Sequence, residues 1–304
     1  MRNRFWTGFW RLADPKISLT SVASIYIGAA VAISESAFSS VWLAVLLVAF
    51  FAIEVAKNAW GDVIDYDSGT DQAVAPEDRT AFSGGKRVLV DNLLTRRQTW
   101  AMAAGFTLVG LAAGAAIVFL REPAAFWIGV AGFVLGWSYH GPPLKLAYRG
   151  LGELDVVACY GPLIALSTYL VLAHELSWEV FWLSVPLGLI IAAFLWINEF
   201  PDFLADRAHG KRNLVVRLGR RRASRILPWI YVAAFAVLSA LPLAGLSGMV
   251  LLGWLAAAPA AYASYQVWRA PETFHRDVPA QPAALIAFLV YSVGTGSGVL
   301  LGSV

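Results

Sequence analysis

Two groups of polar residues have the types and the spacing needed to hold a divalent cation. Each group begins with the pattern Asn-x-x-x-Asp and continues with further acidic residues: Asn58, Asp62 and Asp65 in the first group, and Asn198, Asp202 and Asp206 in the second. On a helix, these spacings place the members of a group along one face. Mg²⁺ prefers oxygen ligands and commonly binds one or two carboxylates together with substrate phosphates. The two groups therefore predict a Mg²⁺ site shared by two helix ends.

The spacing does not identify the last ligand of the first group, because Asp65 is followed two positions later by Asp67. Ser68 and Gly69 then favour a break in the helix. Either carboxylate could face the site, so both stay candidates. The predicted Mg²⁺ ligands are Asp62, Asp65 or Asp67, Asp202 and Asp206.

A basic segment follows each acidic group and could contact a substrate phosphate. The first contains Ser83-Gly84-Gly85-Lys86-Arg87, in which a Gly-Gly turn lets backbone N–H groups approach an anion. Between the two groups, the segment from Tyr139 to Lys145 contains a Pro-Pro pair that ends a helix. Tyr139 could face the site. The candidate phosphate-binding residues are Arg79, Lys86, Arg87, Lys145, Asn198 and Lys211.

The elements that must position these residues are apolar helices of membrane-spanning length. Of the 304 residues, 59% are hydrophobic and 14% are charged, whereas a soluble domain has about 25% charged residues. The mean hydropathy is +0.64. About nine runs approach the roughly 20 apolar residues of a spanning helix, near residues 17–36, 39–60, 97–119, 123–140, 154–173, 180–200, 224–244, 248–268 and 282–303. We predict an all-α polytopic membrane protein, a single domain over residues 1–304, with about nine transmembrane helices around a central cavity.

The distribution of Lys and Arg predicts the orientation. With the predicted helices, alternate loops fall on opposite sides, and Arg121 is the only one of the 23 Lys and Arg residues on one of these sides. The positive-inside rule makes the other side cytoplasmic. We therefore expect a protein of a bacterial-type inner or plasma membrane, with its N-terminus and its active site on the cytoplasmic side. The net charge of +3 then reflects topology, and we expect no nucleic-acid partner because no recognition module is evident.

Simpler interpretations compete with a metal site. A single Asp at a helix end is usually solvated or paired with a nearby Arg, and Lys145 could serve only to anchor its loop at the membrane surface. Two matched acidic groups at a membrane edge favour a functional role, because unpaired carboxylates are costly there. A proton or cation transporter would also use such carboxylates, but it would not account for the two long basic loops beside them.

These segments together resemble the UbiA superfamily of membrane prenyltransferases. The resemblance rests on three motifs: Asn58-x-x-x-Asp62 with trailing Asp, Tyr139-x-x-Pro142-Pro143-x-Lys145, and Asn198-x-x-x-Asp202-x-x-x-Asp206. The segment from Gly210 to Gly219 resembles the branch that contains the menaquinone-pathway (dihydroxynaphthoate) prenyltransferases. Two positions depart from the pattern: Tyr66 stands where the family usually has its next Asp, and Asn213 stands where this branch often has Thr.

The resemblance implies a Mg²⁺-dependent prenyltransferase. Mg²⁺ and basic residues would bind an isoprenyl diphosphate donor, an allylic carbocation would form, and an aromatic quinone precursor in the bilayer would attack it. The resemblance then implies that the catalytic residues are Asn58, Asp62, Asp202, Asp206 and Tyr139. A terpene cyclase on the same scaffold, which would close the donor on itself without an acceptor, uses the same motifs and is the alternative.

Overall fold

A computed structural model describes residues 2–277 and 279–302, and the chain within these ranges is helical without β-strands. The main helices are α1 (Arg2–Ala13), α2 (Pro15–Ser34), α3 (Ser40–Ser68), α5 (Arg96–Leu120), α6 (Ala125–His140), α7 (Gly152–Ala158), α8 (Ile164–Ala173), α9 (Trp178–Ala208), α11 (Arg220–Ala240), α12 (Ala257–Arg269) and α14 (Ala280–Gly302). A π-helical turn (Cys159–Leu163) joins α7 to α8, and a 3-10 helix (Gly248–Ala256) precedes α12. The remaining elements are α4 (Thr70–Ala73), α10 (Leu214–Leu218), α13 (Phe274–Asp277) and 3-10 turns at Pro76–Asp78, Leu146–Tyr148 and Leu241–Ala244. The prediction of an all-α fold is confirmed.

Eight segments of the described chain are long and apolar enough to cross a membrane. They match all but one of the predicted apolar runs, and the remaining run forms α6, an apolar helix of 16 residues. Large apolar side chains lie exposed on the outside of the bundle, for example Leu108, Trp127 and Trp229, which are 66%, 74% and 69% exposed. A continuous surface of this kind is unfavourable in water, so lipid is its natural surrounding.

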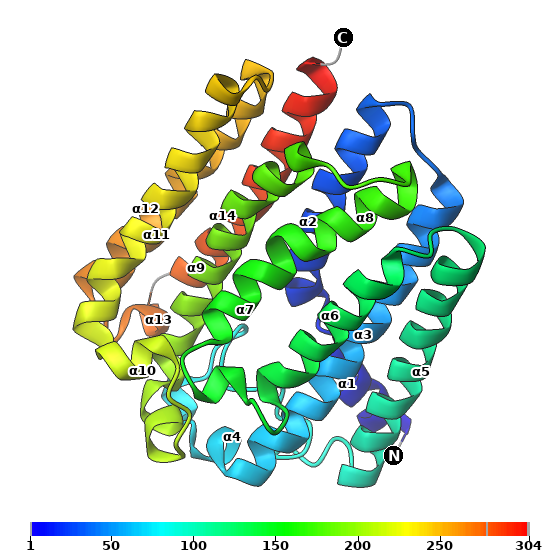
Figure 1. Ribbon diagram of the computed structural model, residues 1–304. Helices are drawn as coiled ribbons and strands as arrows, with labels where there is room; N and C mark the ends of the chain where they lie inside the picture. The colour runs from blue at the N-terminus through cyan, green and yellow to red at the C-terminus, as the bar shows by residue number, and fades with distance from the viewer. Residues whose placement is uncertain (1, 278, 303–304) are drawn as a thin grey trace.

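Helix α9 runs between α7 and α11 (Figure 1). It packs against α2, α7, α11 and α14, and most of its side chains are buried. A helix that is apolar around its whole circumference must be covered by other helices, and residues 187–197 of α9 form such a stretch. The apolar stretch ends at Asn198, so the second acidic group begins at one end of the bundle on a helix that is largely buried.

Both acidic helix ends lie at the same end of the bundle. The connection from α3 to α5 and the connection from α9 to α11 are at the end where the N-terminus lies, and the C-terminus is at the opposite end (Figure 1). The short helices α4 and α10 belong to these two connections. The antiparallel course of the chain therefore brings the ends of α3 and α9, and the basic loops that follow them, to one region.

The π-helical turn between α7 and α8 depends on a glycine. Gly161 has φ −93° and ψ −107° and is followed by Pro162. A Cβ at Gly161 would lie 2.9 Å from the carbonyl oxygen of Ser184 in α9, so a larger residue would push the two segments apart. The residues that precede Gly161, from Asp155 to Tyr160, include several that line the central cavity. The close packing of this turn on α9 thus helps to set the cavity wall.

Candidate active site

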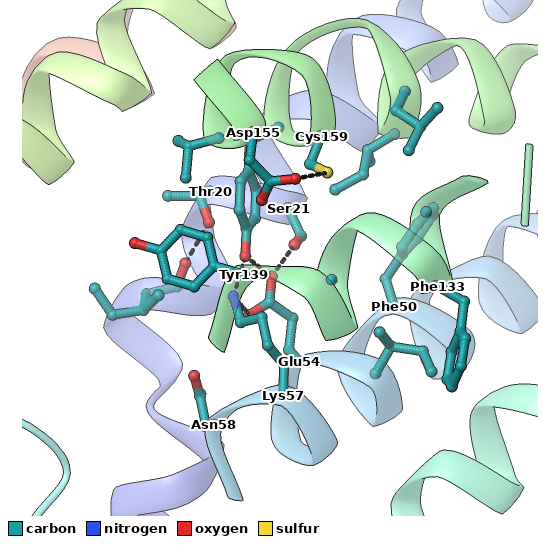
Figure 2. A pocket seen from close by; sticks show the side chains of 18 of the residues that line it. Thr20, Ser21, Phe50, Glu54, Lys57, Asn58, Phe133, Tyr139, Asp155 and Cys159 are labelled. Carbon is teal, nitrogen blue, oxygen red and sulfur yellow. Dashed lines mark hydrogen bonds and ion pairs between the residues drawn. The ribbon is translucent and has the colours of Figure 1, made fainter. Parts of the chain in front are cut away.

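The bundle encloses a cavity of about 760 Å³. Residues of α2, α3, α5, α6, α7, α8 and α9 and of the loop around Ser83 line it. This volume is typical of a small-molecule site. The wall is mostly apolar along α5 and α6 and carries polar residues of α2, α3, α7 and α9. Figure 2 shows the polar residues from α2, α3 and α7.

The first acidic group lies on a buried face of α3. Asp62 and Asp65 are only 4% and 7% exposed. The backbone N–H groups of Val88 and Leu89 donate to the two carboxylate oxygens of Asp62 at 3.3 and 3.4 Å. The hydroxyl of Tyr148 donates to Asp65 Oδ1 at 2.7 Å. Asp62 is therefore held by the long loop before α5, and Asp65 by the segment after α6.

The second acidic group lies near the end of α9. The backbone N–H of Gly84 donates to Asp202 Oδ2 at 3.1 Å, and Asn213 Nδ2 donates to Asp206 Oδ2 at 2.8 Å. The other oxygen of each carboxylate, Oδ1, is buried and has no hydrogen-bond partner in the part of the chain that the structure describes. Buried carboxylate oxygens without a partner are costly unless they meet a cation. These two atoms are therefore suited to bind one.

Lys211 links the two acidic groups. Its Nζ lies 3.0 Å from Asp65 Oδ2 on α3 and 4.0 Å from Asp206 Oδ1 on α9. Burial disfavours the charged form of Lys211, but the two carboxylates outweigh burial and hold the pKa of its ammonium group well above the usual range. Lys211 therefore carries its charge at any working pH, and the two motifs meet around it.

Asp67 points away from this region. Its carboxylate is 38% exposed and lies 2.7 Å from Nη1 of Arg96, at the start of α5. Residues two positions apart do not share a helix face, so Asp65 and Asp67 cannot both approach α9. The structure places Asp65, and not Asp67, beside the second acidic group.

Asp71 is an acidic residue at this site that the sequence analysis did not select. Gly69, with φ +84°, ends α3, and α4 then buries Asp71 to 4% exposure. Burial, together with the charges of Asp65 and Asp62, holds the pKa of the Asp71 carboxyl well above its usual range. A Cβ at Gly85 would lie 2.3 Å from Asp71 Oδ1, so the Gly-Gly turn permits a close approach that another residue would block. The position of Asp71 just after Gly69 is the only sequence signal that could have indicated it.

Seven of the predicted site residues line the cavity: Asn58, Lys86, Tyr139, Asn198, Asp202, Asp206 and Lys211. Lys86 forms an ion pair with Asp14 at the junction of α1 and α2. Asn58 Nδ2 donates to the Leu12 carbonyl oxygen at 2.8 Å. The end of α1 thus contacts two predicted site residues, a role that the spacing of the motifs did not indicate.

Three of the predicted phosphate-binding residues, Arg79, Arg87 and Lys145, are not part of the cavity lining. Arg79 is exposed and donates two hydrogen bonds to a carbonyl oxygen of its own loop. Arg87 Nη1 donates to the Asp71 carbonyl oxygen at 2.8 Å. Lys145 Nζ lies 5.3 Å from the centre of the Tyr148 ring. In this structure all three cations support the loops around the acidic residues.

The acidic residues suit a divalent cation only if a substrate supplies further ligands. No three or more His, Cys, Asp or Glu side chains within residues 2–277 and 279–302 form a group that could hold a metal ion. A Mg²⁺ ion that bridges substrate phosphates, however, needs only one or two carboxylates. The buried Oδ1 atoms of Asp202 and Asp206, which accept no hydrogen bond from the described residues, meet that requirement. The donor set therefore fits Mg²⁺ bound together with a phosphate.

The sequence matches the UbiA prenyltransferase family over residues 21–293. It is 30% identical over 236 residues to UbiA prenyltransferase domain-containing protein 1 of Dictyostelium discoideum, covering 76% of this chain and 70% of that protein. It is 31% identical over 232 residues to 2-carboxy-1,4-naphthoquinone phytyltransferase of Synechocystis sp., covering 73% of this chain and 70% of that protein. It is 26% identical over 262 residues to 1,4-dihydroxy-2-naphthoate octaprenyltransferase of Mycobacterium tuberculosis, covering 86% of each chain.

Solved structures share the fold. A UbiA homolog from Aeropyrum pernix K1, in its apo form, superposes with a TM-score of 0.69 at 20% identity, covering 94% of this chain and 98% of that one. A UbiA homolog from Archaeoglobus fulgidus bound to GPP and Mg²⁺ superposes with a TM-score of 0.65 at 16% identity, covering 97% and 99%. Together with the apolar helices, these matches identify an integral membrane protein.

Proposed function

The chain belongs to the UbiA prenyltransferase family, and on that premise we propose that it transfers a prenyl group from an isoprenyl diphosphate to an aromatic quinone precursor, using Mg²⁺. The observation that carries the proposal is the meeting of the acidic ends of α3 and α9 beside a cavity, with Lys211 paired to both. Two relatives are named for a naphthalene-ring acceptor, a carboxynaphthoquinone in one case and 1,4-dihydroxy-2-naphthoate in the other, and we propose a dihydroxynaphthoate for this chain.

The diphosphate end of the donor would lie at the acidic helix ends. Asp62, Asp65, Asp202 and Asp206 would hold Mg²⁺, which when bound supplies positive charge beside the leaving diphosphate. Lys211 and Lys86 line the cavity and would donate hydrogen bonds to phosphate oxygens. Arg79, Arg87 and Lys145 were predicted to contact phosphate directly. We propose instead that Arg79 and Arg87 hold the loop that carries Asp71 and Gly84, and that Lys145 supports Tyr148.

The prenyl chain would lie along the apolar wall formed by α5 and α6. That wall keeps water away from the carbon that loses the diphosphate, which limits hydrolysis. Tyr139 and Phe133 also line the cavity, and the faces of aromatic rings stabilise a nearby positive charge. We assign Tyr139 this role. Asn58 and Asn198, one helical turn before Asp62 and Asp202, would orient the diphosphate.

We also propose that the N-terminus and the active site face the cytoplasm. Support comes from the basic loops, which lie with the N-terminus at one end of the bundle. The test is a cysteine introduced at the exposed Glu77 in a Cys159→Ser background. A membrane-impermeant thiol reagent should label it in inverted vesicles and not in right-side-out vesicles. The reverse pattern would overturn the orientation.

Product analysis with purified enzyme tests the proposed reaction. Prenyl diphosphates of several lengths are incubated with Mg²⁺, with and without 1,4-dihydroxy-2-naphthoate or other aromatic acceptors. We expect a prenylated aromatic product and pyrophosphate release that both depend on the acceptor. A cyclised hydrocarbon or alcohol formed from the donor alone would establish a terpene cyclase instead, and solute uptake without pyrophosphate release would establish a transporter.

A further inference from the structure

A second polar group lies in the cavity, and Figure 2 shows several of its members. This inner polar group consists of Ser21 on α2, Glu54 and Lys57 on α3, and Asp155 and Tyr160 around the α7–α8 turn, all of which line the cavity. Glu54 precedes Asp62 by eight residues on α3, which at 1.5 Å per residue places it about 12 Å from Asp62 along the helix axis. Glu54 is therefore about two helical turns away from the first acidic group.

Glu54 and Lys57 form an ion pair within the inner polar group. Glu54 Oε1 accepts hydrogen bonds from Ser21 Oγ at 2.6 Å and from Tyr160 Oη at 2.7 Å. Lys57 Nζ lies 3.2 Å from Glu54 Oε2 and also donates to Tyr160 Oη. A charge pair with several hydrogen bonds is tolerated inside an apolar bundle. Glu54 Oε2 is buried and accepts no hydrogen bond from the described residues, so the charge of Lys57 compensates it.

Asp155 has no such set of partners. It is 8% exposed and lines the cavity. Its side chain makes no ion pair with the described residues, and its only hydrogen bond there comes from Cys159 Sγ at 3.8 Å, although a thiol is a weak donor. A buried carboxyl group without a strong partner is unfavourable. The Asp155 carboxylate can therefore accept a hydrogen bond from a molecule that enters the cavity.

Few groups on the two substrates could donate a hydrogen bond to the Asp155 carboxylate. A diphosphate would be repelled by the Asp155 carboxylate, and a prenyl chain has no polar hydrogen to donate. A ring hydroxyl of the aromatic acceptor is the remaining group, and it donates one strong hydrogen bond.

We propose that Asp155, held beside the Glu54–Lys57–Tyr160 network, binds the aromatic acceptor by accepting a hydrogen bond from one of its ring hydroxyls. The inference rests on the proposed prenyl transfer and names the acceptor subsite of that same cavity. It requires no proton transfer or covalent step by Asp155, which is a positioning residue that fixes the ring relative to the donor.

The test compares wild type with Asp155→Asn, using Glu77→Gln as the control for loss of an exposed carboxyl group outside the cavity. We expect the KM for 1,4-dihydroxy-2-naphthoate to rise by about tenfold or more in Asp155→Asn, with the KM for the prenyl diphosphate unchanged within about threefold. Both parameters should stay at wild-type values in Glu77→Gln. An unchanged acceptor KM in a folded Asp155→Asn would overturn the proposal.

A measurement on wild type alone keeps the proposal testable if Asp155→Asn does not fold. Two monohydroxy naphthoates, each lacking one of the two ring hydroxyls, are compared as inhibitors. One should bind at least about tenfold more weakly than the other, because only one hydroxyl reaches Asp155. Equal inhibition constants would refute the assignment. In Asp155→Asn the difference should become smaller, because a neutral amide oxygen accepts a weaker hydrogen bond than a carboxylate, and a merely structural role would not produce this change.

Failure of the proposed function would look different. In that case wild type would transfer no prenyl group to any aromatic acceptor, or would release pyrophosphate equally without one. Failure of the acceptor subsite alone would leave acceptor-dependent transfer intact, with Asp155→Asn behaving like Glu77→Gln.

Discussion

Lys211 Nζ lies 3.0 Å from Asp65 Oδ2, although 146 positions separate the two residues in the sequence. Asp65 lies near the end of α3 and Lys211 follows α9, so this ion pair joins the two acidic motifs. Lys211 also lies 4.0 Å from Asp206. Removing the ammonium group would leave these buried carboxylates facing one another without compensation. The pair therefore suggests a cation kept in place for an anionic substrate.

Lys211→Met should lower turnover by about 10²-fold, the effect of losing one charged donor to a leaving group. The KM for the prenyl diphosphate should rise as well, because Lys211 would contact phosphate. Steady-state kinetics at varied donor concentration checks both values. Arg207→Met is the control, since Arg207 is exposed at the end of α9. A Lys211→Met enzyme within threefold of wild type would remove Lys211 from the site.

Asp65→Asn and Asp67→Asn should differ sharply. Asp65 contacts Lys211 and Tyr148, so its neutralisation should reduce turnover by about 10²-fold. Asp67 forms only an exposed ion pair with Arg96, and such a pair contributes about 0–1 kcal/mol. Turnover of Asp67→Asn should therefore stay within about threefold of wild type. A greater loss of turnover in Asp67→Asn than in Asp65→Asn would show that the helix register at the first motif changes when substrate binds.

Asp202→Asn and Asp62→Asn should each abolish turnover while the protein stays folded. At position 202 the introduced amide oxygen can still accept the hydrogen bond from the Gly84 N–H. At position 62 it can accept only one of the two hydrogen bonds from Val88 and Leu89, which go to different carboxylate oxygens. Both substitutions remove the negative charge that would hold Mg²⁺, and Asp202→Asn does so with the smaller loss of hydrogen bonds. Turnover is measured over a range of Mg²⁺ concentrations, and folding by circular dichroism and gel filtration. Near-normal turnover in both variants at ordinary Mg²⁺ would refute the metal assignment.

The sequence predicted the parts of this molecule that follow from periodicity and local spacing. The apolar runs predicted the helices, because an apolar circumference has no other stable arrangement in a bilayer. The repeated Asn-x-x-x-Asp pattern predicted that Asn58 and Asn198 begin equivalent helix ends, and both line the cavity. These predictions depend only on the geometry of a helix.

The residues that the sequence missed depend on contacts between distant segments. Asp71 reaches the site because Gly69 redirects the chain and Gly85 leaves room for its carboxylate. Asp155 stands out because its only hydrogen bond from the described residues comes from the weakly donating thiol of Cys159, which the sequence spacing does not reveal. Arg79 and Arg87 were assigned by charge, but both make hydrogen bonds to loop carbonyls. Charge in a loop indicates the side of the membrane more reliably than it indicates a ligand.

Asp71→Asn should stabilise the ligand-free protein at pH 8. Burial and neighbouring carboxylates raise the pKa of Asp71 well above its usual range, so the folded state loses stability as pH rises from about 4, the unfolded pKa, through the folded pKa. The stability gained by Asn should therefore shrink between pH 8 and pH 5. Melting temperatures in detergent at the two pH values check this. A gain that is absent at pH 8, or that is equal at both, would contradict the prediction.

Asp91→Asn is the control of opposite sign for the Asp71 experiment. Slight burial raises the pKa of Asp91, but hydrogen bonding and charge from Arg11 and Arg87 outweigh it, and the net pKa is lowered. A lowered folded pKa means that the carboxylate stabilises the protein above about pH 4. Asp91→Asn should therefore be neutral or slightly destabilising at pH 8, by about 0–1 kcal/mol.

Gly85→Ala should damage both stability and turnover. Gly85 has φ +72°, which costs an L-residue about 1–2 kcal/mol, and its new Cβ would lie 2.3 Å from Asp71 Oδ1. The loop must shift, and the neighbouring Gly84 N–H would then move from Asp202. Gly245→Ala isolates the backbone strain, because Gly245 has φ +98° and no atom within 4 Å of the added Cβ. We expect Gly245→Ala to lower the melting temperature but keep full turnover, and Gly85→Ala to lower both. Equal turnover in the two variants would show that the contact between Gly85 and Asp71 is not needed for activity.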